Sequence, residues 1–144
     1  MPGEPTRGLL DTNILILRRS IDPQHLPEIM SISAISLAEL SAGVHMVRED
    51  APDARAERAR RLQVLQLTEH EFDPITFDAD AARAFGLVCD AVLDIGRTPR
   101  RRFADLIIAA VAAANKLPLY TCNPDVIEGL GSIVTIVPVP RPSQ

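Results

Sequence analysis

The sequence predicts a single α/β domain in which a mostly parallel sheet is covered by helices on both faces. Two observations support this prediction. Short apolar segments typical of buried strands alternate with longer segments whose apolar residues recur every three or four positions, as in amphipathic helices. The chain of 144 residues is 47% hydrophobic and 24% charged, which is sufficient for one core formed by residues 1–144.

The first half of the chain contains strands and helices in alternation. Its strand segments are short and apolar, and its helical segments are rich in helix-favouring residues or repeat apolar positions at helical spacing. The predicted elements are a strand at 8–10, a helix at 14–19, a strand at 32–35, a helix that opens at Ser36, a helix at 54–67 and a β-type stretch at 72–77. Pro52 is expected to separate the second and third of these helices.

The second half continues the same alternation. Apolar residues recur at helical spacing from residue 103 to residue 114, so we expect a largely buried helix there. The predicted elements are a helix at 78–95, the helix at 103–114, strands at 118–121 and 133–137, and a short turn or helix at 123–130. Residues 137–144 are expected to form a flexible tail.

Acidic residues follow several of the predicted strands. In a parallel sheet, ligands gather beyond the carboxyl ends of the strands. Asp11 directly follows the first strand, Glu39 comes shortly after the second, and Asp125 follows the strand at 118–121. We therefore expect these carboxylates to converge at one edge of the sheet.

Asp11 is followed by two hydrogen-bonding residues, Thr12 and Asn13. A carboxylate in this place suits a hard cation, and its two neighbours can orient it or hold water. A carboxylate at the start of a helix is equally suited to cap that helix. Both interpretations of Asp11 stay open at the level of the sequence.

Ser36 and Glu39 have the spacing of a capping box, in which both side chains stabilise the start of a helix. This structural interpretation is sufficient for the two residues taken alone. Glu39, however, has apolar neighbours in the sequence, and an ionised carboxylate in an apolar setting needs a partner or a metal ion. The motif therefore has a structural and a metal-binding interpretation.

Asp105 lies in the first turn of the apolar helix, shortly after Arg100, Arg101 and Arg102. One interpretation is that Asp105 pairs with an arginine or complements the helix dipole. The other is that the helix N-terminus keeps Asp105 ionised for metal binding while the arginines contact substrate phosphate. A second arginine cluster, at residues 55–61, is the weaker candidate for RNA contact.

The segment 121–125, with the sequence Thr-Cys-Asn-Pro-Asp, is the last candidate motif. Asn123 as the cap, Pro124 as the first helical residue and Asp125 in the first turn satisfy the preferences of a helix start. This structural interpretation is sufficient, but it does not exclude a role in a site.

Four motifs in this order resemble those of PIN-domain ribonucleases. They are Leu-Leu-Asp11-Thr-Asn, Ser36-Leu-Ala-Glu39-Leu, Asp105-Leu-Ile-Ile-Ala-Ala-Val-Ala and Thr121-Cys-Asn123-Pro-Asp125. Any one of them is a weak indication, but all four in order are specific, and the resemblance extends from residue 8 to about residue 137. More narrowly, the size and the motifs are similar to those of the VapC-type toxins of bacterial toxin–antitoxin pairs.

The resemblance implies a three-layer α/β/α PIN-like fold that hydrolyses RNA with Mg²⁺ or Mn²⁺. Asp11, Glu39 and Asp105 match the three principal acids of the family, and Asp125 is the candidate for the fourth, although the family often has its acid at the position of Asn123 or three residues beyond it. The resemblance also implies a cognate antitoxin protein and a homodimer. The residues expected to orient the acids or to contact substrate are Thr12, Asn13, Ser36, Thr121, Asn123, Arg100, Arg101 and Arg102.

Composition limits the other classes of function. A net charge of −4 argues against a protein that holds nucleic acid by its overall charge. Cys89 and Cys122 are too few for a disulfide framework or a thiolate zinc site, so oxygen ligands and a hard cation are favoured. No apolar segment has the length of a signal peptide or a membrane span, so we expect a cytoplasmic protein.

Two other functions stay as alternatives. A catalytically impaired module with the same fold would bind RNA or a partner protein, and the altered fourth acidic position favours it. An aspartate-dependent phosphatase would use Asp11 as its nucleophile. Asn13 replaces the second acid of the Asp-x-Asp motif of such enzymes, and Lys116, the only lysine, is poorly placed for their third motif.

Overall fold

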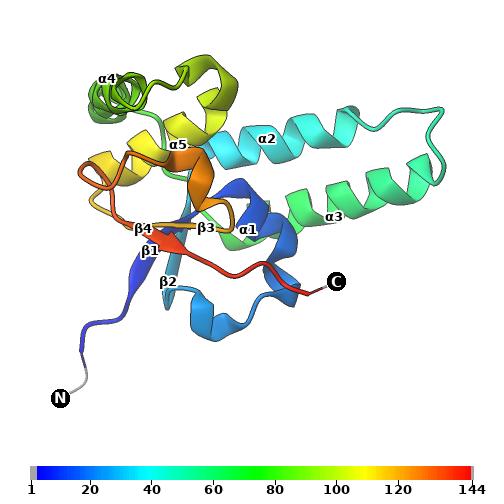
Figure 1. Ribbon diagram of the computed structural model, residues 1–144. Coiled ribbons are helices and arrows are strands. Elements are labelled where there is room, and N and C mark those ends of the chain that lie inside the picture. The colour runs from blue at the N-terminus through cyan, green and yellow to red at the C-terminus, as the bar shows by residue number, and fades with distance from the viewer. Residues whose placement is uncertain (1–2, 144) are drawn as a thin grey trace.

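Four parallel strands form the sheet of the described part of the chain, residues 3–143, in the order β2-β1-β3-β4 (Figure 1). The structure is a computed structural model. Its strands are β1 (Arg7–Leu10), β2 (Ile29–Ile32), β3 (Leu119–Thr121) and β4 (Ile136–Pro138). The predicted parallel sheet is thus confirmed, and the carboxyl ends of all these strands lie at one edge.

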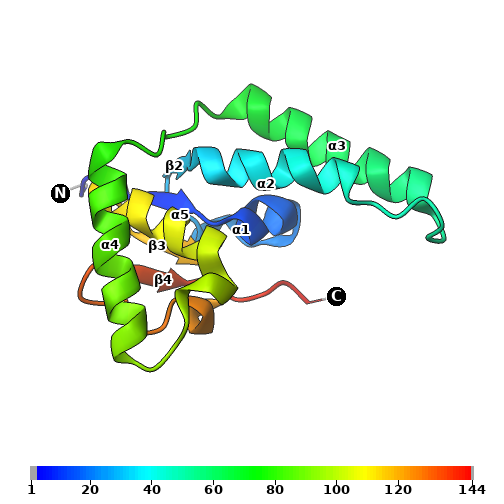
Figure 2. The ribbon, with the colours of Figure 1, turned by 90° about the horizontal axis from the view of Figure 1, so that it is seen from above.

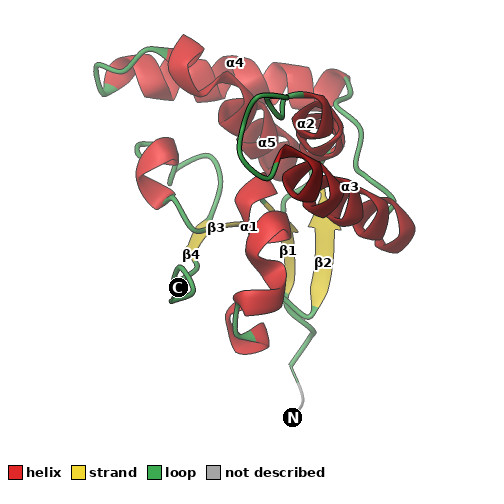
Figure 3. Ribbon diagram, turned by 90° about the vertical axis from the view of Figure 1, so that its right-hand side faces the viewer, coloured by secondary structure: helices red, strands yellow, loops and turns green. Residues whose placement is uncertain are grey.

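Helices pack on the sheet from both sides. They are α1 (Thr12–Leu17), α2 (Ala34–His45), α3 (Ala54–Glu71), α4 (Ala79–Asp94) and α5 (Phe103–Ala114), with short 3₁₀ turns η1 (Arg18–Ser20), η2 (Pro23–His25), η3 (Pro99–Arg102) and η4 (Pro124–Ile127). α2 and α3 run side by side as a long pair, and α4 packs on α5 (Figure 2). β2 points toward the end of the molecule where α2, α3 and α5 lie (Figure 3).

Successive residues of the strands face opposite sides of the sheet, as the two-residue period of a strand requires. Leu9 and Leu119, which are paired between β1 and β3, belong to a buried core shared with α4 and α5. Leu10 and Tyr120, the next pair, belong to a second buried core with residues of α1, α2 and α3. The two cores confirm the three-layer arrangement, because each face of the sheet is covered by helices.

The junction between β2 and α2 differs from the prediction by several residues. The strand ends at Ile32, and the helix begins at Ala34 because the hydroxyl of Ser33 accepts a hydrogen bond of 3.0 Å from the backbone N–H of Ile35. Ser33 is therefore the N-cap, and the prediction that Ser36 opens the helix is wrong. The side chain of Ser36 is instead fully buried inside the first turns of α2.

Residues 72–77 are another point of difference, because they do not form a strand. Within the described residues this stretch pairs only through an isolated parallel bridge between Ser33 and Ile75. β2 ends at Ile32 and α2 begins at Ala34, so beyond Ser33 the chain is helical and offers no extended backbone with which residues 72–77 could pair. The pairing therefore stops after one bridge. The chain then enters α4, which is capped by Asp78 through a hydrogen bond of 2.9 Å from the N–H of Ala81.

The pairing of the C-terminal segment with β3 extends closer to the C-terminus than the sequence predicted. We expected a tail from residue 137, but β4 continues to Pro138, and the N–H of Val139 donates to the carbonyl of Thr121 at 2.8 Å. The side chain of Val139 is buried in the second core, which explains why the strand extends this far. Residue 144, the end of the expected tail, lies outside the described residues.

Among residues 3–143, no helix has both the length and the apolar character needed to cross a bilayer.

Candidate active site

Asp11 stands between the end of β1 and the start of α1. It caps α1, because its Oδ1 accepts a hydrogen bond of 3.0 Å from the backbone N–H of Ile14. Its second oxygen, Oδ2, accepts a hydrogen bond from the hydroxyl of Thr121 at the end of β3. The carboxylate is therefore fixed from two neighbouring strand ends, and the capping role predicted for Asp11 is present.

Glu39 is held at the same edge by a chain of hydroxyl groups. The Thr12 hydroxyl donates to Glu39 Oε1 at 2.6 Å and lies 2.9 Å from the hydroxyl of the buried Ser36. Since Thr12 has one proton and gives it to the carboxylate, Ser36 is the donor to Thr12. The motif that resembled a capping box thus orients Glu39 toward α1 instead of capping α2.

Asp105 is half-buried in the first turn of α5. Burial raises the pKa of Asp105 above its ordinary value, and the nearby carboxylates of Glu39 and Asp11 raise it further, while Arg102 lowers it. The pKa of Asp11 is also raised, first by burial, although its hydrogen bonds from Thr121 and Ile14 lower it and the charge of Glu39 raises it again. These acids therefore lie close enough to act on one another electrostatically, and each charge makes ionisation of its neighbours less favourable.

Two adjoining hollows expose these acids. The first is lined by Asp11, Asn13, Asp105, Ile108, Leu119, Thr121, Asn123 and Ile127. The second is a groove, here called the acidic groove, lined by Asp11, Thr12, Asn13, Ile16, Glu39, Leu40, Gly43, Glu57, Arg60, Arg61, Val64 and Asp105. The predicted acids Asp11, Glu39 and Asp105 meet there although they come from three separate elements.

The oxygen donors suit a hard divalent cation. Among the described residues no three Asp, Glu, His or Cys side chains already enclose a point that could hold an ion. Mg²⁺ does not require such a cage, because it keeps several waters and is commonly bound through one or two carboxylates. The carboxylate oxygens of Asp11, Asp105 and Glu39 therefore have the chemistry that Mg²⁺ or Mn²⁺ prefers.

Asp125 is the predicted acid that the structure does not bring into this group. It is exposed on η4 and lines a different hollow, together with Arg97, Arg101, Arg102 and Glu128. Arg97 ties this turn down, because it donates to the backbone carbonyl of Asp125 and to the carboxylate of Glu128, both at 2.6 Å.

Asn123, not Asp125, lines the hollow that contains Asp11 and Asp105. Its side-chain Oδ1 accepts a hydrogen bond of 2.7 Å from Arg141, and the charge of Arg141 lowers the pKa of Asp11. Sequence reasoning missed Arg141, because it lies in the segment that we expected to be a tail. Its position two residues beyond the apolar Val139 was the available indication that the chain returns to the sheet there.

The three arginines predicted to contact substrate form the turn η3 directly before α5. Arg100, Arg101 and Arg102 are all exposed. Arg101 and Arg102 line the hollow next to Asp125, and the charge of Arg102 reaches Asp105, whose pKa it lowers.

Comparison with known proteins agrees with this geometry. The family model of the PIN domain matches residues 8–129. Ribonuclease VapC5 of Mycobacterium tuberculosis is 32% identical to the chain in an alignment 141 residues long that covers 94% of this chain and 98% of that protein.

Solved structures give the same result. VapBC-5 from Mycobacterium tuberculosis, a member of the VapBC family of toxin–antitoxin systems, superposes with a TM-score of 0.74 at 29% identity, over 94% of this chain and 100% of that chain. VapBC2 from Rickettsia felis, bound to a DNA fragment from its promoter, has a TM-score of 0.67 at 20% identity over 93% and 99%, and supports the fold alone. With its motifs, its three-layer fold and a family model that covers most of its length, the chain belongs to the PIN domain family.

Proposed function

We propose that this protein is an endoribonuclease that depends on Mg²⁺ or Mn²⁺ and acts as the toxin of a toxin–antitoxin pair. The observation that carries the proposal is the meeting of Asp11, Glu39 and Asp105 in one groove at the carboxyl edge of the sheet. The relative named ribonuclease VapC5 and the VapBC structure at 29% identity support the same activity and the same biological role.

Each of the three acids has a defined part in this proposal. A divalent cation held by these acids would supply an activated water for attack on phosphorus and would stabilise the leaving oxygen. Asp11, fixed by Thr121 and the start of α1, and Asp105 at the start of α5 would bind the cation most directly. Glu39, held by Thr12, would bind it or orient its water.

The surrounding residues would position the substrate. Asn13 and Asn123 line the hollow beside Asp11, where their amide groups can hold water or a ribose hydroxyl. Arg101 and Arg102 would contact the phosphate next to the cleaved bond, because guanidinium groups bind phosphate oxygens in pairs. We place Asp125 outside the ligand set and assign the fourth position to Asn123.

Cleavage of labelled single-stranded RNA in Mn²⁺ tests the activity. We expect Asp11→Asn and Asp105→Asn each to abolish cleavage, because each removes a charge that the cation needs. The matched control is Asp90→Asn, which changes an exposed acid of α4 away from both hollows and should cleave like the unmodified protein. RNA binding without cleavage by the unmodified protein would instead indicate the catalytically impaired binding module.

The partners belong to the same proposal. We expect a small cognate antitoxin that binds near the acidic groove, a homodimer formed through apolar helix faces, and a cytoplasmic location, where RNA is met. Co-purification with the product of the neighbouring small open reading frame tests the antitoxin, light scattering tests the dimer, and cell fractionation tests the location. Harmless expression in bacteria, with no such partner recovered, would remove the toxin assignment and leave the nuclease assignment standing.

A further inference from the structure

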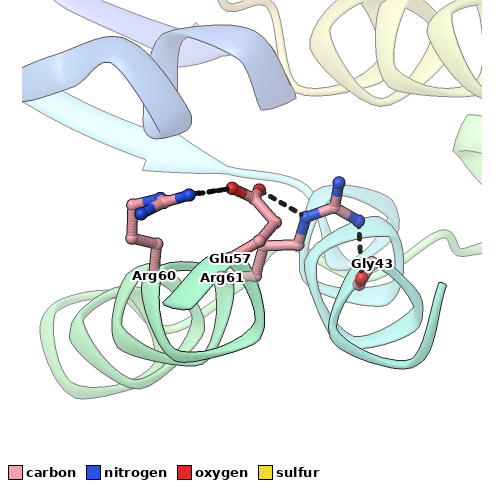
Figure 4. Close-up of polar contacts among 4 residues, drawn as sticks. All are labelled: Gly43, Glu57, Arg60 and Arg61. Carbon is pink, nitrogen blue, oxygen red and sulfur yellow. Dashed lines mark hydrogen bonds and ion pairs between the residues drawn. The ribbon is translucent and has the colours of Figure 1, made fainter. Parts of the chain in front are cut away.

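The far wall of the acidic groove carries two arginines that the mechanism above does not use. Arg60 and Arg61 lie on α3, and both line the groove that also contains Asp11, Glu39 and Asp105. The two arginines share the carboxylate of Glu57, one turn earlier on the same helix (Figure 4).

The two arginines differ in how firmly they are held. Arg61 donates to Glu57 Oε1 at 2.9 Å and to the backbone carbonyl of Gly43 at 2.8 Å (Figure 4). Gly43 lies in the last turn of α2, where its carbonyl also accepts a hydrogen bond of 3.2 Å from the backbone N–H of Met46. A guanidinium is favourable at this negative end of the helix. Arg61 therefore ties α3 to α2, the helix that carries Glu39.

Arg60 has a looser attachment. Its Nε and Nη2 both donate to Glu57 Oε2, at 3.2 and 2.6 Å, and 63% of its side chain is exposed. An ion pair this open to water adds little to stability, so exchanging it costs little. Because Arg61 satisfies the other oxygen of Glu57, Arg60 can leave without freeing the link between the helices.

RNA in this groove needs a cation on that wall. The groove contains four carboxylates, of Asp11, Glu39, Glu57 and Asp105, which disfavour a phosphate backbone unless a cation or an arginine offsets their charge. Arg101 and Arg102 line the hollow beside η4 and are not among the residues that line the groove. A strand of RNA that passes over the acids would therefore meet arginines on one side at η3 and on the other side at α3.

We propose that Arg60 is a substrate-binding residue that leaves Glu57 to bind a backbone phosphate of single-stranded RNA, while Arg61 stays in place as a positioning residue for α2. The inference rests on the proposed ribonuclease function, which it deepens by giving the RNA a path across α3. Glu57 acts as a competitor for the phosphate: it keeps Arg60 oriented in the free protein and releases it to RNA.

Binding of a fluorescent single-stranded RNA, measured by anisotropy in EDTA at several salt concentrations, tests this without catalysis. Arg60→Gln should weaken binding by about three- to tenfold and reduce the slope of log Kd against log salt by about 0.7, the value for one phosphate contact. Arg55→Gln is the control, because it removes the same charge from an exposed position of α3 that does not line the groove.

Glu57→Gln should change the RNA affinity in the opposite direction. Removing the charge of Glu57 should tighten RNA binding. The control is Glu69→Gln, which removes an exposed acid of the same helix outside the groove and should tighten binding less. If Glu57 and Arg60 only stabilised α3, both variants would lower the melting temperature and leave RNA affinity equal to that of their controls. That outcome would overturn the proposal.

The remaining outcomes separate this inference from the proposed function. In Mn²⁺, Arg60→Gln should raise KM with kcat little changed, since the hydrogen bonds of Arg60 go to Glu57 and not to Asp11, Glu39 or Asp105. If the unmodified protein cleaves RNA and Arg60→Gln matches Arg55→Gln, this inference fails alone. If the unmodified protein neither cleaves nor binds RNA, both fail. An unchanged RNA affinity with weakened antitoxin binding would assign Arg60 to the protein partner and overturn the RNA assignment.

Discussion

The hydroxyl of Thr121 connects the end of β3 to the proposed metal ligand Asp11, and replacing it with a methyl group tests how the site is built. Thr121→Val keeps the shape of a side chain that is 2% exposed. It removes the hydrogen bond to Asp11 Oδ2. It also removes the acceptor of the Asn123 N–H, which in the unmodified protein donates to the Thr121 hydroxyl at 3.0 Å. The change therefore disturbs the site without altering its charge.

The size of the effect follows from these contacts. A hydrogen bond to a charged group contributes about 1.5–3 kcal/mol, so we expect the free energy of unfolding in EDTA at about pH 7.5 to fall by roughly that amount. For a domain of this length the loss corresponds to a decrease of roughly 4–10 °C in Tm.

The effect should also depend on pH. Burial holds the folded pKa of Asp11 above its unfolded value, so the ionised carboxylate costs stability in neutral solution, and Thr121 reduces that cost by lowering the folded pKa. The contribution of this hydrogen bond is therefore present above the folded pKa and is lost as the pH falls through it. Thr121→Val should be much less destabilising at about pH 4 than at about pH 7.5.

Urea denaturation at both pH values, followed by circular dichroism, measures the two free energies. Thr135→Val, at an exposed position just before β4, is the control and should stay within about 0.5 kcal/mol of the unmodified protein. If Thr121→Val also stays within that range at about pH 7.5, or costs the same at both pH values, the hydroxyl does not hold the charged form of Asp11.

Three further variants probe the site and the core. In EDTA at neutral pH, Asp105→Asn should raise Tm. Burial and the acidic neighbours hold the folded pKa of Asp105 above the unfolded value, so its ionised form costs stability that acid would restore. The increase in Tm that excess Mn²⁺ causes should be smaller for Asp105→Asn than for the unmodified protein, as scanning fluorimetry can show. Gly8→Ala should destabilise the fold by about 1–3 kcal/mol, because its new Cβ would overlap the ring of Tyr120; equal urea midpoints would refute this. Leu106→Ala should cost about 2–5 kcal/mol, since Leu106 is 1% exposed in the core between α4 and α5; a smaller loss in urea would mean that the core closes around the gap.

The sequence predicts those elements whose apolar pattern is determined by the core. The helix expected at 103–114 is found at those residues, because its buried side chains keep helical spacing throughout. The boundary of α2 could not be located in the same way. Ser33 and Ser36 are both acceptable caps locally, and the choice depends on Thr12, which is distant in the chain and takes Ser36 as a hydrogen-bond donor.

The site is predicted only in part for the same reason. Asp11, Glu39 and Asp105 follow from strand ends and from a first helical turn, which a parallel sheet brings to one edge. Whether Asn123 or Asp125 reaches that edge depends on the path of the turn η4, which Arg97 fixes through contacts with Asp125 and Glu128. Contacts between residues so far apart in the chain leave no pattern in the local sequence.

The structural and the metal-binding interpretations of Asp11 are compatible. An ionised carboxylate has about four acceptor positions on its two oxygens. The N–H of Ile14 and the hydroxyl of Thr121 take one position on each oxygen. These two bonds leave about two acceptor positions on a carboxylate that also lines the acidic groove. Capping therefore fixes the carboxylate without using all of its acceptor positions, and a local motif cannot separate the two roles. What separates them is the presence of Glu39 and Asp105 in the same groove, because a helix cap does not require two further acids beside it.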